Sequence, residues 1–259
     1  MKIIIQENPK ELGIAAGKRS AALIREAIQK KGSADIILAT GASQFETLNQ
    51  LIKEDDIRWD KVSMFHLDEY IGLPASHKAS FRKYLKERFL DKVPKLRAVH
   101  LINGEVDPFE ECERLEALIS QIQIDLALVG IGENGHLAFN DPPADFETTR
   151  AYIVAELDQQ CRRQQVNEGW FASMEEVPRQ AISMSVKQIM LSTHIVCSVP
   201  DKRKANAVRD TVEQQVSNLY PASILQNHPS CYLFLEKLSA SELKARPSLN
   251  YVENRELIK

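Results

Sequence analysis

Short apolar runs alternate with longer amphipathic stretches along most of the chain. Such runs, bounded by polar residues, are typical of buried strands, whereas apolar residues at helical spacing indicate helices that cover a sheet. The predicted strands are residues 2–6, 35–39, 61–67, 98–102, 124–129, 194–199 and 231–235. The predicted helices are residues 12–30, 44–53, 79–90, 108–123 and 201–217. This alternation predicts one α/β domain, residues 1–259, built on a largely parallel sheet.

The predicted helix 108–123 illustrates the pattern. Apolar residues recur in it at helical spacing, so they predict a single face turned toward the sheet. These residues are Phe109, Cys112, Leu115, Ile119 and Ile122.

Residues 159–173 break the alternation, because they are mostly polar and end in Trp170 and Phe171. The stretch contains two adjacent arginines, Arg162 and Arg163. One interpretation is a solvated helix. The other is a mobile helical lid over a site, which we place at residues 156–174.

Composition narrows the class of protein. The 259 residues are 44% apolar and 27% charged, with a formal charge of −3 and no basic stripe or tail. This balance is typical of a globular protein and argues against nucleic-acid or anionic-membrane partners. No apolar run suits a signal peptide or a membrane span, and the four cysteines are scattered without paired spacing. Reduced thiols and a cytoplasmic location are therefore expected.

Ligands of parallel sheets gather beyond the carboxyl ends of the strands, so the residues after each strand carry the most information. The first such segment is Thr40-Gly41-Ala42-Ser43. A glycine and two hydroxyl residues at a strand-to-helix turn allow backbone N–H groups to meet an anion. The alternative is an ordinary turn in which Ser43 caps the helix.

A second anion signal comes after the strand 194–199, where Lys202, Arg203 and Lys204 open a predicted helix. Basic residues in the first turn of a helix oppose its dipole, so they do not favour helix stability. A bound anionic substrate would remove this conflict. An exposed basic turn is the alternative.

Two adjacent carboxylates, Asp68 and Glu69, come directly after the apolar strand 61–67. A sheet end does not need such a pair for stability. One of them, in a partly dry cleft, could serve as a general base because desolvation raises its pKa. Solvated turn acids are the alternative.

The segment after strand 124–129 begins Gly-x-Gly-x-x-Gly, a dinucleotide-binding pattern. That pattern requires a helix to open on the glycines, and Pro142 and Pro143 prevent it, so we reject a dinucleotide site. The better interpretation is a glycine-rich loop that presents His136 between Asn134 and Asp141. These two polar side chains can orient an imidazole, which favours acid/base duty over a structural role. The other histidines have no metal-ligand spacing, so no metal site is expected.

These segments resemble the glucosamine-6-phosphate deaminase/isomerase family over nearly the whole chain. One motif is Asp68-Glu69-Tyr70-x-Gly72-Leu73-Pro74-x-x-His77-x-x-Ser80-Phe81. The other is Gly130-x-Gly132-x-Asn134-Gly135-His136-x-Ala138-Phe139-Asn140-Asp141-Pro142. The resemblance implies a Rossmann-like parallel sheet flanked by helices. It also implies conversion of glucosamine 6-phosphate and water to fructose 6-phosphate and ammonium.

The resemblance further implies residue roles. His136 would assist opening of the sugar ring, and Asp68 would move a proton between C2 and C1. The loop of Thr40, Gly41, Ala42 and Ser43, together with Lys204, would hold the phosphate. No metal or organic cofactor is implied. The sequence leaves a homo-oligomer open.

The chain departs from the family pattern at three places. Better-known members have aspartate at Asn134 and glutamate at Asp141. Asparagine still hydrogen-bonds an imidazole without offering a charge, and the shorter Asp141 is expected to reach His136 through water. The family's Ser-Arg-Phe-Phe reads Glu168-Gly169-Trp170-Phe171 here, so an arginine that contacts phosphate is missing. Arg162 or Arg163 is the candidate substitute.

Three other functions are compatible with the sequence. A galactosamine-6-phosphate deaminase differs only in its sugar. A 6-phosphogluconolactonase shares the Gly-x-Gly-x-x-Gly-His loop, but there the loop typically continues Ser-Leu-Phe-Pro. A non-catalytic sugar-phosphate sensor is favoured by Asn134 and opposed by Asp68 and His136.

Overall fold

The structure is a computed structural model that describes residues 1–244, so the end of the predicted domain, from residue 245, lies outside the described residues. Its main sheet has seven strands in the order β1-β10-β9-β6-β2-β3-β5, and every pair in it is parallel. The strands are β1 (Lys2–Gln6), β2 (Ala34–Leu38), β3 (Val62–His66), β5 (Ala98–His100), β6 (Leu126–Val129), β9 (His194–Val199) and β10 (Cys231–Glu236). All seven predicted strands lie in this sheet, and the predicted α/β class is confirmed.

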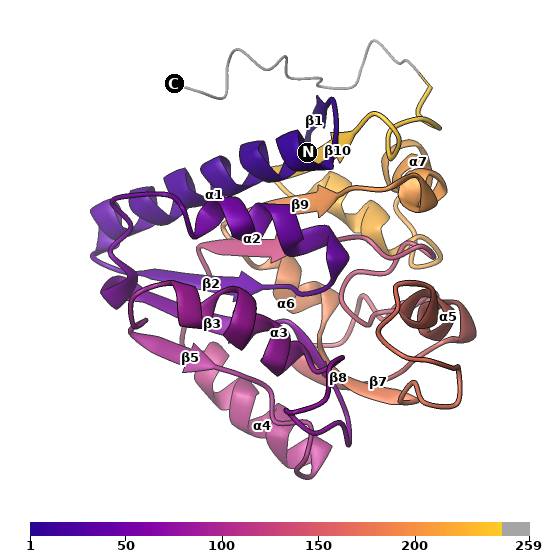
Figure 1. Cartoon of the computed structure of the whole chain (residues 1–259), viewed down its shortest axis with the longest axis horizontal. Coiled ribbons are helices and arrows are strands. Elements are labelled where there is room, and N and C mark those ends of the chain that lie inside the picture. The colour runs from indigo at the N-terminus through magenta and orange to yellow at the C-terminus, as the bar shows by residue number, and fades with distance from the viewer. Residues whose placement is uncertain (245–259) are drawn as a thin grey trace.

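Helices cover both faces of the sheet (Figure 1). The helices are α1 (Pro9–Lys31), α2 (Phe45–Leu51), α3 (Phe81–Arg88), α4 (Pro108–Ile119), α5 (Gln159–Asn167), α6 (Val186–Met190) and α7 (Ala205–Glu213). Strand β2 shows how the layers form, because its side chains alternate between faces. Ile36 and Leu38 pack with residues of α1, α2 and α3, whereas Ile37 packs with residues of α4, α6 and α7.

A second sheet of three antiparallel strands lies beside the first and was not predicted. It has the order β4-β8-β7, with β4 (Asp68–Tyr70), β7 (Tyr152–Glu156) and β8 (Gln180–Met184). Only Leu67 separates β3 from β4. Its N–H donates to Leu38 O in the main sheet (3.2 Å), and its carbonyl accepts from Met184 N in the second (2.8 Å). The chain therefore passes directly from one sheet to the other just before Asp68.

Short 3₁₀ segments occupy several turns: η1 (Ala42–Gln44), η2 (Trp59–Lys61), η3 (Leu90–Lys92), η4 (Lys202–Lys204) and η5 (Pro221–Asn227). Two of them, η1 and η4, come after the carboxyl ends of β2 and β9. Since the main-sheet strands are parallel, their carboxyl ends all lie at the same end of the sheet. Helices α5 and α7 lie beyond these carboxyl ends (Figure 1).

Two details of the predicted helices were wrong. The predicted helix 201–217 is divided into η4 and α7, so Lys202, Arg203 and Lys204 precede the α-helix instead of forming its first turn. In α4, Cys112, Leu115 and Ile119 are buried as expected, but Phe109 is 66% exposed. Helical spacing identifies a face but does not show how far the sheet extends beneath its first turn.

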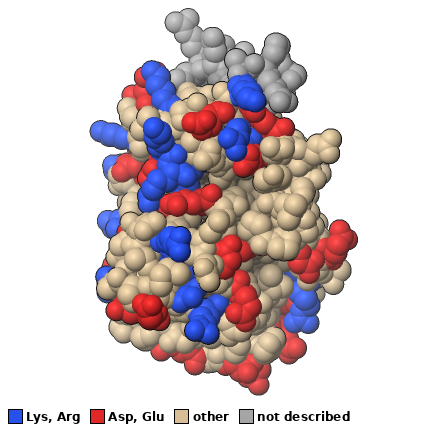
Figure 2. Space-filling view, turned by 90° about the vertical axis from the view of Figure 1, so that its right-hand side faces the viewer, with Lys and Arg blue, Asp and Glu red and all other residues tan. Residues whose placement is uncertain are grey.

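Acidic and basic side chains are mixed on one face of the molecule (Figure 2). Figure 2 shows Lys and Arg mixed with Asp and Glu on the face turned to the viewer, without a continuous basic stripe there. Cys112, Cys161, Cys197 and Cys231 are buried free thiols, as predicted. Within residues 1–244, no helix combines the length and apolarity that crossing a bilayer requires.

Candidate active site

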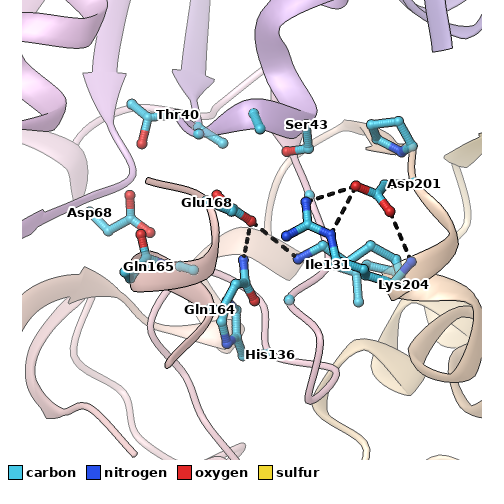
Figure 3. Close-up of a pocket in the computed structure, with 18 of the residues that line it drawn as sticks. Thr40, Ser43, Asp68, Ile131, His136, Gln164, Gln165, Glu168, Asp201 and Lys204 are labelled. Atoms are coloured by element: carbon cyan, nitrogen blue, oxygen red, sulfur yellow. Dashed lines mark hydrogen bonds and ion pairs between the residues drawn. The ribbon is translucent and has the colours of Figure 1, made fainter. Parts of the chain in front are cut away.

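A cavity of about 420 Å³ opens at the carboxyl edge of the main sheet (Figure 3). Each of the four segments chosen from the sequence contributes to its wall. The contributing residues include Thr40, Gly41, Ala42 and Ser43 after β2, Asp68 after β3, Gly130, Gly132 and His136 after β6, and Lys204 after β9. Asn134 and Asp141 are not in the wall and contact His136 from behind.

Two glycines determine the conformation of the loop after β2 and its close approach to the loop after β6. Gly41 has φ 85°, a left-handed conformation that favours glycine, and its carbonyl accepts a hydrogen bond from Tyr84 Oη (3.0 Å). Ser43 does not cap a helix, because it lies inside η1 and its Oγ accepts from Gln44 Nε2 (3.2 Å). A side chain at Gly130 would place Cβ 2.6 Å from Ser43 Oγ, so glycine allows the two loops to meet.

The adjacent carboxylates Asp68 and Glu69 have different environments. Successive side chains of a strand point to opposite sides, and Glu69 points toward the start of α3. There it accepts from Ser80 Oγ (2.9 Å) and from the N–H groups of Phe81 and Arg82 (3.2 and 2.8 Å). Asp68 lines the cavity, and no residue within 1–244 donates a hydrogen bond to its carboxylate or forms an ion pair with it. Glu69 is therefore fixed by hydrogen bonds, whereas the carboxylate of Asp68 faces the cavity.

Burial controls the protonation of Asp68. Desolvation, with a smaller contribution from the neighbouring charge of Glu69, raises the pKa of Asp68 to about 8. A carboxyl group with such a pKa can both accept and return a proton near neutral pH. This is the behaviour expected of a general base in a dry cleft.

His136 is oriented by a direct hydrogen bond. Its Nδ1 lies 2.9 Å from Asp141 Oδ1, so the prediction that the shorter acid reaches it through water was wrong. Asn134 forms its hydrogen bond with the backbone and not with the imidazole, since its Oδ1 accepts from the N–H of His136 (3.1 Å) and its Nδ2 donates to Asp141 and Asp158. Any side chain at Gly132 would place Cβ 2.3 Å from His136 Nε2, so this glycine makes room for the imidazole. Because Asp141 occupies Nδ1, Nε2 remains for a substrate.

Three polar side chains form a network behind His136. Asn134 Nδ2 donates to Asp141 Oδ1 (3.0 Å) and to Asp158 Oδ2 (3.1 Å). Asp158 also caps α5, since its Oδ1 accepts from Cys161 N. Burial acts to raise the pKa of Asp141, but hydrogen bonds from His136 and Asn134 outweigh it and the pKa is lowered. Asp141 therefore stays ionised beside the imidazole.

The cationic part of the cavity is Lys204, whose side chain is 7% exposed. Burial lowers its pKa, and the charge of Glu168, 3.8 Å from Nζ, opposes that shift. Arg203 also lines the cavity, but its guanidinium pairs with Asp201 (2.7 Å) and Glu133 (3.5 Å). Asp201, rather than a bound anion, thus offsets much of the charge in this turn.

The segment predicted as a lid supplies cavity residues that the sequence did not identify. Gln164, Gln165 and Glu168, from α5 and its end, line the wall. The suggestion that Arg162 or Arg163 replaces the family arginine was wrong. Arg162 donates to the carbonyls of Met174 and Val177, and neither arginine lines the cavity. Movement of the segment stays a prediction.

One group of side chains in the described part of the chain has the proximity of metal ligands. Ligand atoms of His136, Asp141 and Cys161 lie within 4.8 Å of one another. Burial and the charge of Asp141 raise the pKa of the Cys161 thiol well above its usual value, so it stays protonated and is a poor ligand. The His136 Nδ1 is also already bonded to Asp141.

Comparison with known proteins assigns the family. The family model described as glucosamine-6-phosphate isomerases/6-phosphogluconolactonase matches residues 7–233, and the chain belongs to this family. It is 36% identical to a glucosamine-6-phosphate deaminase of Shouchella clausii, over 93% of this chain and 97% of that one. A deaminase of the same name from Thermoanaerobacter pseudethanolicus is 34% identical, over 93% and 94% of the two chains.

Solved structures agree with this family. The structure of a monomeric glucosamine-6-phosphate deaminase superposes with a TM-score of 0.86 at 31% identity, covering 93% of this chain and all of that one. A 6-phosphogluconolactonase from Trypanosoma brucei superposes with a TM-score of 0.78 at 17% identity, covering 94% and 98%. At that identity the second likeness concerns the fold alone.

Proposed function

We propose that this chain is a glucosamine-6-phosphate deaminase, which converts glucosamine 6-phosphate and water to fructose 6-phosphate and ammonium. One observation carries the proposal. The unpaired carboxylate of Asp68, the oriented imidazole of His136 and the buried cation of Lys204 all line a single cavity. The relatives that are deaminases at 34–36% identity over 93% of the chain support the same reaction.

In this proposal, the loop of Thr40–Ser43 and Lys204 bind the phosphate. His136 Nε2 takes the proton of the C1 hydroxyl and delivers it to the ring oxygen as the C1–O5 bond breaks. Asp68, as the carboxylate, removes the C2 proton of the open-chain aldehyde and returns it to C1, while a second proton passes from the amino group to the C1 oxygen. The resulting C2 imine is hydrolysed by water to the ketone and ammonia. Asp141 and Asn134 position His136, and no metal or organic cofactor takes part.

The test is ammonia release from glucosamine 6-phosphate, with fructose 6-phosphate measured in the same reaction. Asp68→Asn should lower kcat by roughly 10²–10⁴, the usual contribution of a general base. It should retain phosphate binding, because Asp68 is not part of the phosphate subsite.

Parallel substrates separate the alternatives. Faster turnover of galactosamine 6-phosphate would reassign the sugar, and hydrolysis of 6-phosphogluconolactone without ammonia release would reassign the reaction. Binding of these sugar phosphates without turnover of any would identify a sensor.

A further inference from the structure

Glu168 places a carboxylate inside the cavity where the phosphate subsite requires cations. It is the last residue of the turn that ends α5, and its side chain is 7% exposed. Oε1 accepts from Gln164 Nε2 (2.8 Å) and lies 3.8 Å from Lys204 Nζ, while Oε2 accepts from Trp170 Nε1 (3.2 Å). The labelled side chains in Figure 3 show this carboxylate directed toward Lys204.

Lys204 needs this carboxylate when the cavity holds no substrate. A buried ammonium without a counter-ion is strongly unfavourable. Glu168 is the only carboxylate within 4.0 Å of Lys204 Nζ among residues 1–244. Asp201 and Glu133 form their ion pairs with Arg203, and they attract Lys204 less strongly than Glu168 does. Glu168 therefore fills the position of an anion in the empty site.

A substrate phosphate cannot join this arrangement without cost. It carries a charge of about −1.5 to −2 near neutral pH, and like charges a few ångströms apart in a buried site repel strongly. The phosphate must therefore displace Glu168 from Lys204. Part of the attraction of Lys204 for phosphate is lost in this exchange.

We propose that Glu168 is an internal counter-ion that competes with the substrate phosphate for Lys204 and thereby sets the affinity and phosphate selectivity of the site. A strongly charged phosphate ester can displace it, whereas neutral or weakly anionic sugars cannot. The part of the inference that assigns phosphate to Lys204 rests on the proposed function.

The chain departs from the family pattern at Gly169 as well as at the adjacent Glu168. The family's arginine position is occupied by Gly169, whose φ of +81° lies in the left-handed region. An arginine there would be strained, because side chains rarely adopt this conformation. The chain therefore lacks a cation and carries an acid at the same turn, and both differences weaken phosphate binding.

The experiment compares binding of inorganic phosphate to the full chain by isothermal titration calorimetry at pH 7.5. Glu168→Gln removes the charge but keeps the shape, and we expect it to bind phosphate at least about tenfold more tightly than wild type. Glu175→Gln is the matched control, since it removes an exposed acid seven residues away that neither lines the cavity nor pairs with Lys204. Its affinity should stay within about threefold of wild type.

Lys204→Ala, alone and combined with Glu168→Gln, completes the comparison. The gain from Glu168→Gln should disappear when Lys204 is absent. Unchanged or weaker phosphate binding by Glu168→Gln would overturn the inference, and so would a full gain in the absence of Lys204.

A second measurement does not depend on how the Glu168 variant folds. The chain has two tryptophans, and Trp59→Phe leaves Trp170 as the only fluorophore of this kind. Phosphate should change the fluorescence emission of Trp170, because Glu168 then no longer accepts the hydrogen bond of its indole N–H. The Kd obtained from this change should equal the Kd from calorimetry. Phosphate binding without any change would contradict the inference. Neither readout needs turnover, so absence of ammonia release would refute the proposed function alone.

Discussion

At the scale of single residues, the cavity separates two acids that are neighbours in the chain. Glu69 receives hydrogen bonds at the start of α3, whereas Asp68 receives none from the described residues and is buried. The sequence indicated that one of the pair could be a base, but it could not indicate which. That distinction depends on the alternation of β4 and on Ser80, eleven residues further along the chain.

The raised pKa of Asp68 predicts a pH dependence of catalysis. In the proposed mechanism Asp68 must be ionised to accept the C2 proton, and its pKa is about 8. We therefore expect kcat/KM for glucosamine 6-phosphate to increase as pH rises from 6 to 8 and then level. A profile that is flat across this range would contradict the assignment of Asp68 as the base, provided that substrate protonation is corrected for.

The same group predicts a dependence of stability on pH. The pKa of Asp68 is raised from 3.8 to about 8 on folding, so the unfolded chain releases this proton at lower pH than the folded one. The free energy of unfolding therefore falls as pH rises from about 4 to 8. Asp68→Asn should abolish this contribution and raise Tm at pH 8.5.

A gain of about 1 kcal/mol in the free energy of unfolding raises Tm by roughly 2–4 °C for a chain of this size. At pH 4 the two proteins should unfold at nearly the same temperature, which is the internal control. Equal Tm values at pH 8.5 as well would show that Asp68 ionises without penalty.

At the scale of elements, α5 begins at the residues that orient His136 and ends at the residue that faces Lys204. Its cap, Asp158, bonds to Asn134, and its last turn presents Glu168 to the cavity. The helix therefore connects the surroundings of His136 with those of Lys204. The sequence showed only a polar stretch there, because polarity alone does not distinguish a solvated helix from one that lines a polar cavity.

This connection predicts the effect of restoring the family aspartate at position 134. Asn134 Nδ2 bridges the carboxylates of Asp141 and Asp158, and Asn134→Asp would replace that donor with a third negative charge. We expect a loss of about 1–3 kcal/mol in the free energy of unfolding at pH 7, together with lower kcat. Chemical denaturation and steady-state kinetics measure the two effects.

The matched control is Asn167→Asp, the same change at an exposed position of α5. The double variant Asn134→Asp/Asp158→Asn returns a donor amide to the network and should recover much of the lost stability. If the double variant does not recover stability, the hydrogen bonds from Asn134 Nδ2 to Asp141 and Asp158 are not the contribution of this residue.

At the scale of the whole molecule, the sequence predicted the main sheet but not the second one. Seven apolar runs separated by amphipathic stretches identify buried parallel strands with little ambiguity. Strand β4 has three residues, and its partner β8 lies more than one hundred residues away in the sequence. Such a strand carries too little local pattern to be detected.

The site was predictable to a similar degree. Strand ends identified Thr40, Asp68, His136 and Lys204, because the loops after parallel strands all gather at one edge of the sheet. Glu168 was not identified, because α5 brings it to the cavity from outside that sheet.

The order of strands has a consequence for synthesis on the ribosome. Strand β1 pairs with β10, from Lys2 beside Tyr232 to Gln6 beside Glu236. At translation speeds of about 5–20 residues per second, β1 leaves the ribosome roughly 10–45 s before β10 exists. Throughout that interval the nascent chain exposes the unpaired edge of β1, and after residue 199 has been added it also exposes the unpaired edge of β9, each ready to pair with another chain. A chain released early, before residue 231, would keep both edges open and is the form most prone to aggregate.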